Sequence, residues 1–166
     1  ETPKPGDPLF DRVQNVIIGS NRLAAEAATT QARQEGFNSL LLTTSLQGEA
    51  RHVGRVLASL GRELVESAQP LPRPACLVAG GETTVTLTGS GKGGRNQELA
   101  LSAVRDLAGL QDVVLVSLAT DGGDGPTDAA GAVVSGSSMS RATSLGLGPD
   151  AFLKNNNAYF FFEALG

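Results

Sequence analysis

Short apolar segments alternate with segments of helical spacing in the first part of the chain, and this order most constrains the fold. Residues 15–18 and 39–44 have the character of short strands. A helix is predicted after each of these strands. The first, residues 20–36, is rich in alanine, begins at Ser-Asn and stops at a glycine, and the second, residues 48–66, has apolar positions three and four apart. A strand–helix–strand–helix order favours parallel strands joined by crossover helices.

The second part of the chain begins after a proline-rich connector and is predicted to contain a hairpin. Residues 75–79 and 83–88 have strand character, and Gly80-Gly81 between them favours a tight turn. Further elements are expected in the order helix, strand, strand, helix, at residues 96–107, 112–119, 130–134 and 138–145. We therefore predict an α/β fold with a mixed, largely parallel sheet flanked by helices and a hairpin in the middle of the chain.

Composition narrows the class of protein. Aromatic residues make up only 4% and Trp is absent, so an aliphatic core is expected, as in α/β proteins. The net charge of −4 and the lack of a basic stripe argue against nucleic-acid and membrane partners, and the apolar runs are too short to span a bilayer. The single cysteine, Cys76, excludes an intrachain disulfide and leads us to expect a cytoplasmic protein.

Residues 89–98, GSGKGGRNQE, form the first candidate site. Glycines in the pattern G-x-G-x-x-G let a backbone approach a ligand closely, and the following helix would present free N–H groups. Lys92 and Arg95 add positive charge, and a guanidinium can bind a carboxylate or phosphate with two hydrogen bonds. The pattern indicates an anion site.

This loop fits neither standard nucleotide fingerprint. A dinucleotide site needs an acid at the far end of the next strand, and Asp112 stands at its start. A Walker A loop needs Ser or Thr after its lysine, and Lys92 is followed by glycine. The alternative is a flexible turn with a solvated lysine.

Residues 120–128, TDGGDGPTD, form the second candidate site, just past a strongly apolar strand. Asp121 and Asp124 could hold Mg²⁺, or one of them could accept a proton from a substrate hydroxyl. The alternative is an ordinary Asp-Gly turn. A cationic and an anionic loop at one sheet edge together suit a phosphorylated or carboxylated substrate, and Glu82 is a further candidate there.

Two long stretches then resemble a known family. AGGETTVTLTGSGKGGRNQELAL and ATDGGDGPTDAAGAVV are similar to the C-terminal MOFRL region of glycerate 2-kinases, some of which carry the label hydroxypyruvate reductase. VIIGSNRLAAEAA and LLLTTSLQGEAR resemble the segments that precede this region. The resemblance divides the chain into a βαβα segment, residues 1–74, and a MOFRL region truncated at its C-terminus, residues 75–166, which we expect to pack as one α/β domain.

The resemblance implies phosphoryl transfer from ATP to D-glycerate with Mg²⁺. Arg95 would bind the substrate carboxylate or the transferring phosphate, and Asp121 and Asp124 would serve catalysis, as metal ligands or in hydroxyl activation. The remaining residues expected to bind substrate or phosphate, or to shape that site, are Gly91, Lys92, Gly93, Gly94, Asn96, Gln97, Glu98 and Glu82.

The chain also departs from the family pattern. It lacks the Rossmann-like N-terminal domain and the closing Gly-Thr-Asn motif, so we expect the chain alone to be inactive and that domain to be its partner. A homodimer is a further candidate assembly. Two other functions stay open: an NAD(P)H-dependent hydroxypyruvate reductase, and a non-catalytic domain that binds an anionic metabolite.

Overall fold

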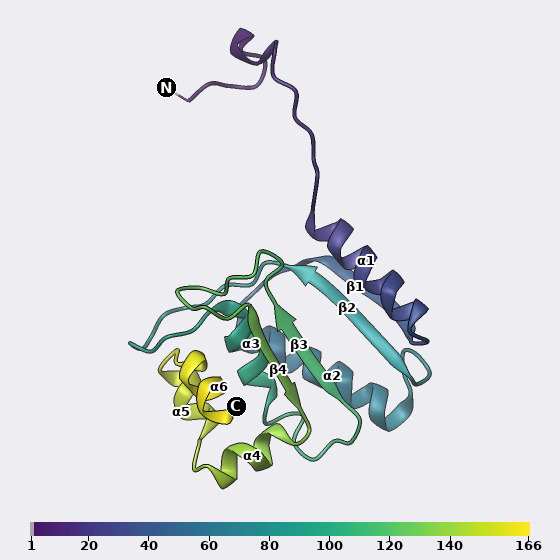
Figure 1. The fold of residues 1–166 in the computed structure, drawn as a ribbon, viewed down its shortest axis with the longest axis vertical. Coiled ribbons are helices and arrows are strands. Elements are labelled where there is room, and N and C mark those ends of the chain that lie inside the picture. Colours follow the sequence, from purple (N-terminus) through teal and green to yellow (C-terminus); the bar gives the residue numbers. More distant parts are fainter. Residues whose placement is uncertain (1) are drawn as a thin grey trace.

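The computed structural model describes residues 2–166 and places the strands in two separate pairs (Figure 1). β1 (Asn38–Leu46) and β2 (Ala75–Gly81) are parallel, with Asn38 opposite Ala75. β3 (Val114–Leu118) and β4 (Gly131–Ser135) are antiparallel, with Val114 opposite Ser135. The α/β class is thus confirmed, with one parallel and one antiparallel pair.

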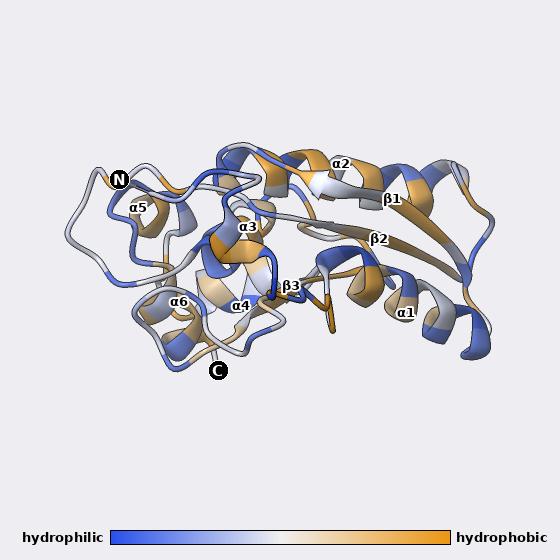
Figure 2. Cartoon of the chain, turned by 90° about the horizontal axis from the view of Figure 1, so that it is seen from above, coloured by the Kyte–Doolittle hydropathy of each residue, from blue (hydrophilic) through white to orange (hydrophobic). Residues whose placement is uncertain are grey.

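Helices surround these strand pairs. They are η1 (Pro8–Phe10), α1 (Asn21–Gln34), α2 (Ala50–Ser67), α3 (Arg95–Ala103), α4 (Ser138–Ser144), α5 (Pro149–Lys154) and α6 (Ala158–Leu165). Seen from above, α1 and α2 lie on opposite sides of the β1–β2 pair (Figure 2). Among residues 2–166, no helix combines the length and the apolar character needed to cross a membrane.

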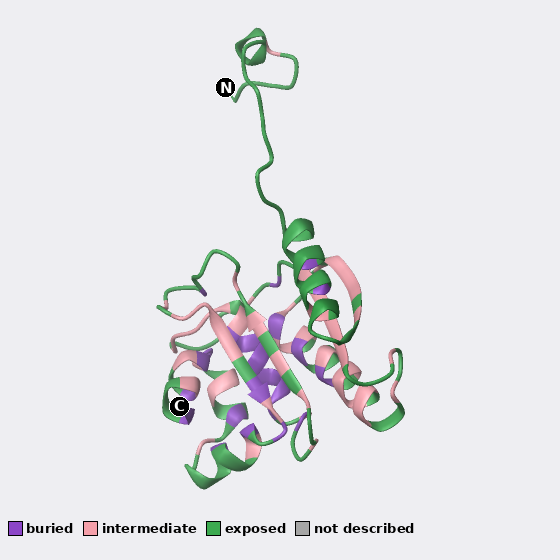
Figure 3. Ribbon diagram, turned by 45° about the vertical axis from the view of Figure 1, so that its right-hand side comes forward, coloured by how far each residue is buried: buried purple, intermediate pink, exposed green. Residues whose placement is uncertain are grey.

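The core is built around α3. Residues 97–103 of this helix are all buried, and Figure 3 shows the buried residues gathered behind β3 and β4. The largest fully buried aliphatic and aromatic side chains are Phe161, Leu101, Leu107, Val104 and Val134. A helix that is buried on all sides must be positioned by its neighbours, so its N-terminus is a rigid place for a site.

Local signals predicted most helices well. The Ser20 side chain accepts a hydrogen bond from the Leu23 N–H at 3.2 Å, which caps α1 as expected. Helices α2, α3 and α4 lie within two residues of the expected starts, although α3 ends earlier than predicted. The short helix α5, which begins at Pro149, was not predicted.

Two predicted strands are wrong. Residues 15–18 have no strand partner among the described residues, and Ile18 is 95% exposed. The hairpin at Gly80-Gly81 is also wrong, because β2 continues straight through both glycines. Residues 83–88 form only one isolated bridge, between Thr84 and Glu49. Side-chain oxygens of Glu49 and Asn156 accept the backbone hydrogen bonds that a partner strand would have accepted.

Gly54 allows α2 to lie against α3 at short range. A Cβ at this position would stand 2.1 Å from the Leu99 carbonyl oxygen and 2.2 Å from the Ser102 hydroxyl. On the same helix, a Cβ at Gly61 would make ordinary contacts, 3.4 Å from Val113 and 3.7 Å from Leu107. The two glycines therefore serve different purposes.

We predict that Gly54→Ala lowers the free energy of unfolding by about 1–3 kcal/mol, because the added methyl group forces α2 away from α3. Gly61→Ala is the matched control and should raise stability by up to about 1 kcal/mol through helix propensity. Urea denaturation of both variants measures these changes. Equal effects at the two positions would contradict the packing described here.

Candidate active site

Two loops meet at the N-terminus of α3. The glycine loop (residues 88–94) leads into this helix, and the aspartate loop (residues 119–130) joins β3 to β4. The arrowheads of β2 and β3 point to the same end of the molecule in Figure 1, and both loops lie there. Because ligands of open α/β sheets bind beyond such strand ends, this end is the candidate active site.

The Asp124 carboxylate joins the two loops from a buried position. Its Oδ1 accepts hydrogen bonds from the backbone N–H and the side-chain amide of Asn96, at 2.9 and 3.1 Å. Its Oδ2 accepts from the same two groups of Gln97, at 2.8 and 3.1 Å. Asp124 therefore caps the N-terminus of α3 although it lies far from this helix in the sequence. The N-cap residue itself, Gly94, has no side chain that could accept these hydrogen bonds.

The side chains of Asn96 and Gln97 extend this junction. Gln97 also donates to the Thr127 hydroxyl at 2.9 Å, which keeps the aspartate loop folded onto α3. Asn96 accepts a hydrogen bond from the Ser117 hydroxyl of β3 at 2.8 Å. Both amides thus connect α3 to the aspartate loop or the strand before it.

The glycine loop is held by the asparagine turn, residues 155–157. Asn156 Oδ1 accepts from the N–H groups of Thr88 and Gly89, at 2.7 and 2.9 Å. The N–H groups of Ser90, Gly91 and Lys92 bind the Asn155 side chain, the Asn155 carbonyl and the Asn157 side chain, respectively, at 3.1, 2.9 and 2.9 Å. Protein oxygens therefore already bind the N–H groups of residues 88–92, which a phosphate-binding loop would offer to its ligand.

The first glycines of this loop permit that contact. A Cβ at Gly89 would lie 2.5 Å from the Asn155 backbone, and one at Gly91 would lie 2.4 Å from Asn157 Cβ. Any larger residue at either position would push the loop off the turn. These glycines are needed for protein packing here.

The last two glycines bring the loop against the aspartate loop and α6. A Cβ at Gly94 would lie 2.3 Å from Asp124 Cγ, so only glycine lets the carboxylate reach the helix end. A Cβ at Gly93 would stand 3.2 Å from the Ala158 nitrogen, a tight but less severe contact. The end of the glycine loop is therefore as closely packed as its beginning.

Arg95 opens α3 and makes an exposed ion pair. Its Nη1 donates to Glu82 Oε1 at 2.7 Å, with the side chains 44% and 75% exposed. Exposed pairs of this kind contribute at most about 1 kcal/mol, so a ligand carboxylate or phosphate could replace Glu82 at small cost. The structure thus brings together these two predicted site residues beside the helix end that Asp124 caps.

Lys92 carries the second cation of the glycine loop. Its ammonium nitrogen lies 4.2 Å from the centroid of the Tyr159 ring. The Tyr159 hydroxyl hydrogen-bonds to Asp128, which lowers the pKa of Asp128; the positive charge of Lys92 contributes to this shift. The same hydrogen bond is the main reason that the pKa of Tyr159 is raised above its usual value. These three residues form a charged cluster next to the aspartate loop.

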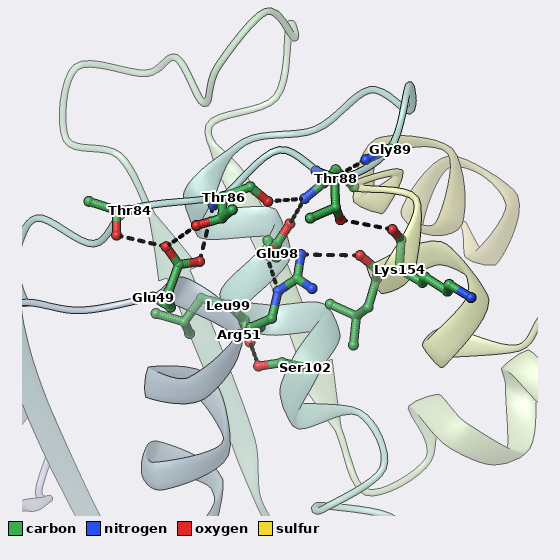
Figure 4. Close-up of polar contacts among 12 residues, drawn as sticks. Glu49, Arg51, Thr84, Thr86, Thr88, Gly89, Glu98, Leu99, Ser102 and Lys154 are labelled. Carbon is green, nitrogen blue, oxygen red and sulfur yellow. Dashed lines mark hydrogen bonds and ion pairs between the residues drawn. The ribbon is translucent and has the colours of Figure 1, made fainter.

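Glu98 faces the protein interior. It is 2% exposed and accepts from Arg51 Nε at 2.8 Å and from Asn156 Nδ2 at 3.0 Å. Figure 4 shows Arg51 between Glu98 and the C-terminal residues of α5, where it donates to the Leu153 carbonyl at 3.2 Å. Glu98 thus ties α3 to α2 and to the asparagine turn.

Glu49, at the start of α2, fixes the segment that precedes the glycine loop (Figure 4). It accepts hydrogen bonds from the Thr86 hydroxyl and N–H at 2.8 and 3.1 Å and from the Thr84 hydroxyl at 3.2 Å. The hydrogen bonds from Thr86 are the main reason that the pKa of Glu49 is lowered. An anionic Glu49 therefore anchors this segment to α2.

Asp121 lies in the exposed part of the aspartate loop. Its Oδ1 accepts from the Gly123 N–H at 3.3 Å, the pattern of an Asp turn. Within residues 2–166, no group of three or more His, Cys, Asp or Glu side chains could hold a metal ion. A metal held at this end would depend largely on ligands supplied by its substrate.

Sequence analysis missed several residues of this site. Arg51 and Tyr159 lie outside the two loop motifs, and Asp128 ends the motif TDGGDGPTD, but no local signal singles out any of the three. The side chains of residues 155–157 bind a loop about 65 residues away, a contact that the sequence does not reveal. The three consecutive asparagines are the only signal that could have drawn attention to this turn.

The candidate site is separate from a depression on another part of the surface. A depression of about 550 Å³ lies elsewhere, between residues 108–114 and 135–140, and none of the predicted site residues lines it. Of the charged groups at this end of the molecule, Arg95, Asp121 and Asp128 are exposed, whereas Lys92 is half-buried and Asp124 is buried.

The α/β fold and the two facing loops define a class of ligand-binding α/β domain, and comparisons identify the family. Residues 75–166 match the MOFRL family, and the chain belongs to it. It is 46% identical over 159 residues to the D-glycerate 2-kinase of Thermotoga maritima, covering 96% of this chain and 37% of that protein.

A solved structure and a second relative also match this chain. The crystal structure of the Thermotoga maritima glycerate kinase matches with a TM-score of 0.89, over 91% of this chain and 36% of that one. A putative hydroxypyruvate reductase of Agrobacterium vitis is 37% identical over 168 residues, covering all of this chain and 38% of that protein. The chain thus spans just over a third of the length of these relatives.

We predict that Asp124→Asn lowers the free energy of unfolding by about 2–3 kcal/mol, because one carboxylate oxygen becomes an NH₂ group that faces N–H donors. Asp121→Asn is the control and should change stability by less than about 0.5 kcal/mol, because this carboxylate is exposed. Chemical denaturation measures both. An unchanged free energy of unfolding in Asp124→Asn would mean that the helix cap is not formed.

Proposed function

We propose that the chain is the C-terminal part of an ATP-dependent glycerate kinase, which transfers a phosphoryl group to D-glycerate and releases phosphoglycerate and ADP. Family membership and the names of the similar proteins support this proposal. The observation that carries it is the pair of cations, Lys92 and Arg95, on a rigid loop and helix end.

Arg95 is proposed to bind the substrate carboxylate or the transferring phosphate. Its guanidinium is already oriented by Glu82, and an incoming anion takes the place of that carboxylate. Lys92 supplies a second positive charge to the same ligands. Phosphoryl transfer needs positioning and charge neutralisation more than covalent chemistry, and two cations on a fixed frame suit that need.

The two aspartates are proposed to divide their tasks. Asp124 acts as a positioning residue, because four donors already occupy its carboxylate. Asp121 has an exposed carboxylate and fits the role of ligand to Mg²⁺, which usually takes one or two carboxylates together with phosphate oxygens and water. Bound Mg²⁺ would neutralise charge on the phosphates of ATP.

A further part of the protein is proposed to complete the site, namely the Rossmann-like N-terminal domain. The short span of the chain relative to these relatives supports this. Apolar surface supports it too: Val114, Val116 and Leu118 on one face of β3, with Val133 on β4, are more than half exposed. Exposed apolar patches commonly mark contact surfaces.

A second candidate is a nicotinamide-dependent hydroxypyruvate reductase, favoured by the name of the Agrobacterium vitis relative. The geometry favours it less. A ribose-binding acid belongs at the carboxyl end of a strand, whereas Asp112 lies two residues before the start of β3. Incubation of a full-length protein that contains these residues with hydroxypyruvate and NADH or NADPH distinguishes the two activities.

We predict that Arg95→Ala in such a full-length protein lowers ATP- and D-glycerate-dependent turnover about 10²- to 10³-fold. The reason is that the guanidinium no longer stabilises the negative charge of the transition state. Release of ADP measures this turnover. Arg105→Ala is the matched control: Arg105 also makes an exposed ion pair, with Asp150 at 2.6 Å, and should leave turnover unchanged. An unchanged rate for Arg95→Ala would contradict its central role.

The 166-residue chain alone provides a further control. It should turn over D-glycerate at a negligible rate, because the proposed site needs the missing domain. A rate equal to that of the full-length protein would contradict the proposed division of the site.

A further inference from the structure

Lys92 is held at three points by residues at the start of α6. Its backbone N–H donates to Asn157 Oδ1 at 2.9 Å, and its carbonyl accepts from the Tyr159 N–H at 3.0 Å. Its ammonium then lies over the Tyr159 ring, 4.2 Å from the centroid. Residues 157–159 therefore position both the backbone and the ammonium group of Lys92.

The Tyr159 ring is itself fixed. It packs edge-on against Phe160, with centroids 5.3 Å apart. Its backbone belongs to the first turn of α6, which packs against the core through Phe161. The ring is thus a surface that α6 holds beside Lys92.

A lysine side chain normally loses much rotamer freedom when it binds a ligand. A ring that already holds the ammonium reduces this loss, and the attraction between cation and ring remains after an anion binds from the other side. Because Lys92 makes no ion pair of 4 Å or less among the described residues, its charge is available to such an anion.

We propose that Tyr159 is a positioning residue that presents the Lys92 ammonium to an anionic substrate. This inference rests on the proposed function, in which Lys92 contacts ATP or D-glycerate. It assigns a role to a residue that lies outside both loop motifs.

The test in the full-length protein compares three variants by their KM and kcat. Tyr159→Leu removes the ring and should raise the KM for the substrate that Lys92 contacts about two- to fivefold, the range expected for an exposed cation–ring contact. Tyr159→Phe keeps the ring and should restore a KM near that of the unmodified protein. Ala164→Ser is the control at an exposed position of the same helix and should leave KM and kcat unchanged. An unchanged KM in Tyr159→Leu would overturn the proposal.

A second readout does not depend on activity. Tyr159 is the only tyrosine of the 166-residue chain, which has no tryptophan, so its fluorescence reports this site alone. Adding inorganic triphosphate should change the emission, and Lys92→Met should strongly reduce that change. If triphosphate changes the emission of Lys92→Met as much as that of the unmodified chain, the proposal is overturned. This test remains valid even where Tyr159→Leu fails to fold.

The two readouts separate the proposals. If the unmodified full-length protein does not phosphorylate D-glycerate, the proposed function fails, while the fluorescence titration still judges the contact between Tyr159 and Lys92. If the protein is active and Tyr159→Leu behaves as the unmodified protein does, only the positioning role fails.

Discussion

The hydrogen bonds of Asn156 are the interaction on which the candidate site depends. This buried side chain accepts from two N–H groups of the glycine loop and donates to the Thr86 carbonyl and to Glu98. Glu98 in turn binds Arg51 of α2. The Asn156 amide therefore joins the glycine loop to α3 and, through the partly buried Arg51–Glu98 ion pair, to α2. Its backbone is left-handed, with φ of 50°, a conformation that asparagine tolerates better than most residues.

This arrangement changes the role of a glycine-rich loop. In phosphate-binding loops the backbone N–H groups bind the ligand. Here asparagine oxygens bind these groups from Thr88 to Lys92, and the glycines permit the close approach of the asparagine turn. The loop becomes a rigid support, so binding of an anion falls to side chains that extend from it, Lys92 and Arg95. Rigid placement of such groups is what phosphoryl transfer requires of a protein.

The sequence predicted those parts that local chemistry determines. Ser20 marks the start of α1, and the apolar residues 39–44 mark β1. It failed where distant side chains replace a strand partner: residues 83–88 alternate like a strand, but Glu49 and Asn156 satisfy their backbone. It predicted that Arg95 lies at a sheet edge with Asp124, but burial and four donors turn that aspartate into a helix cap, which no spacing reveals.

Amide hydrogen exchange, followed residue by residue by NMR with and without inorganic triphosphate, tests the central claim most directly. The asparagine turn predicts that the N–H groups of residues 88–92 are protected in the ligand-free chain and that triphosphate leaves their exchange rates unchanged. Fast exchange without ligand, and protection that appears only when triphosphate is added, would mean that the loop binds phosphate through its backbone and would contradict this account.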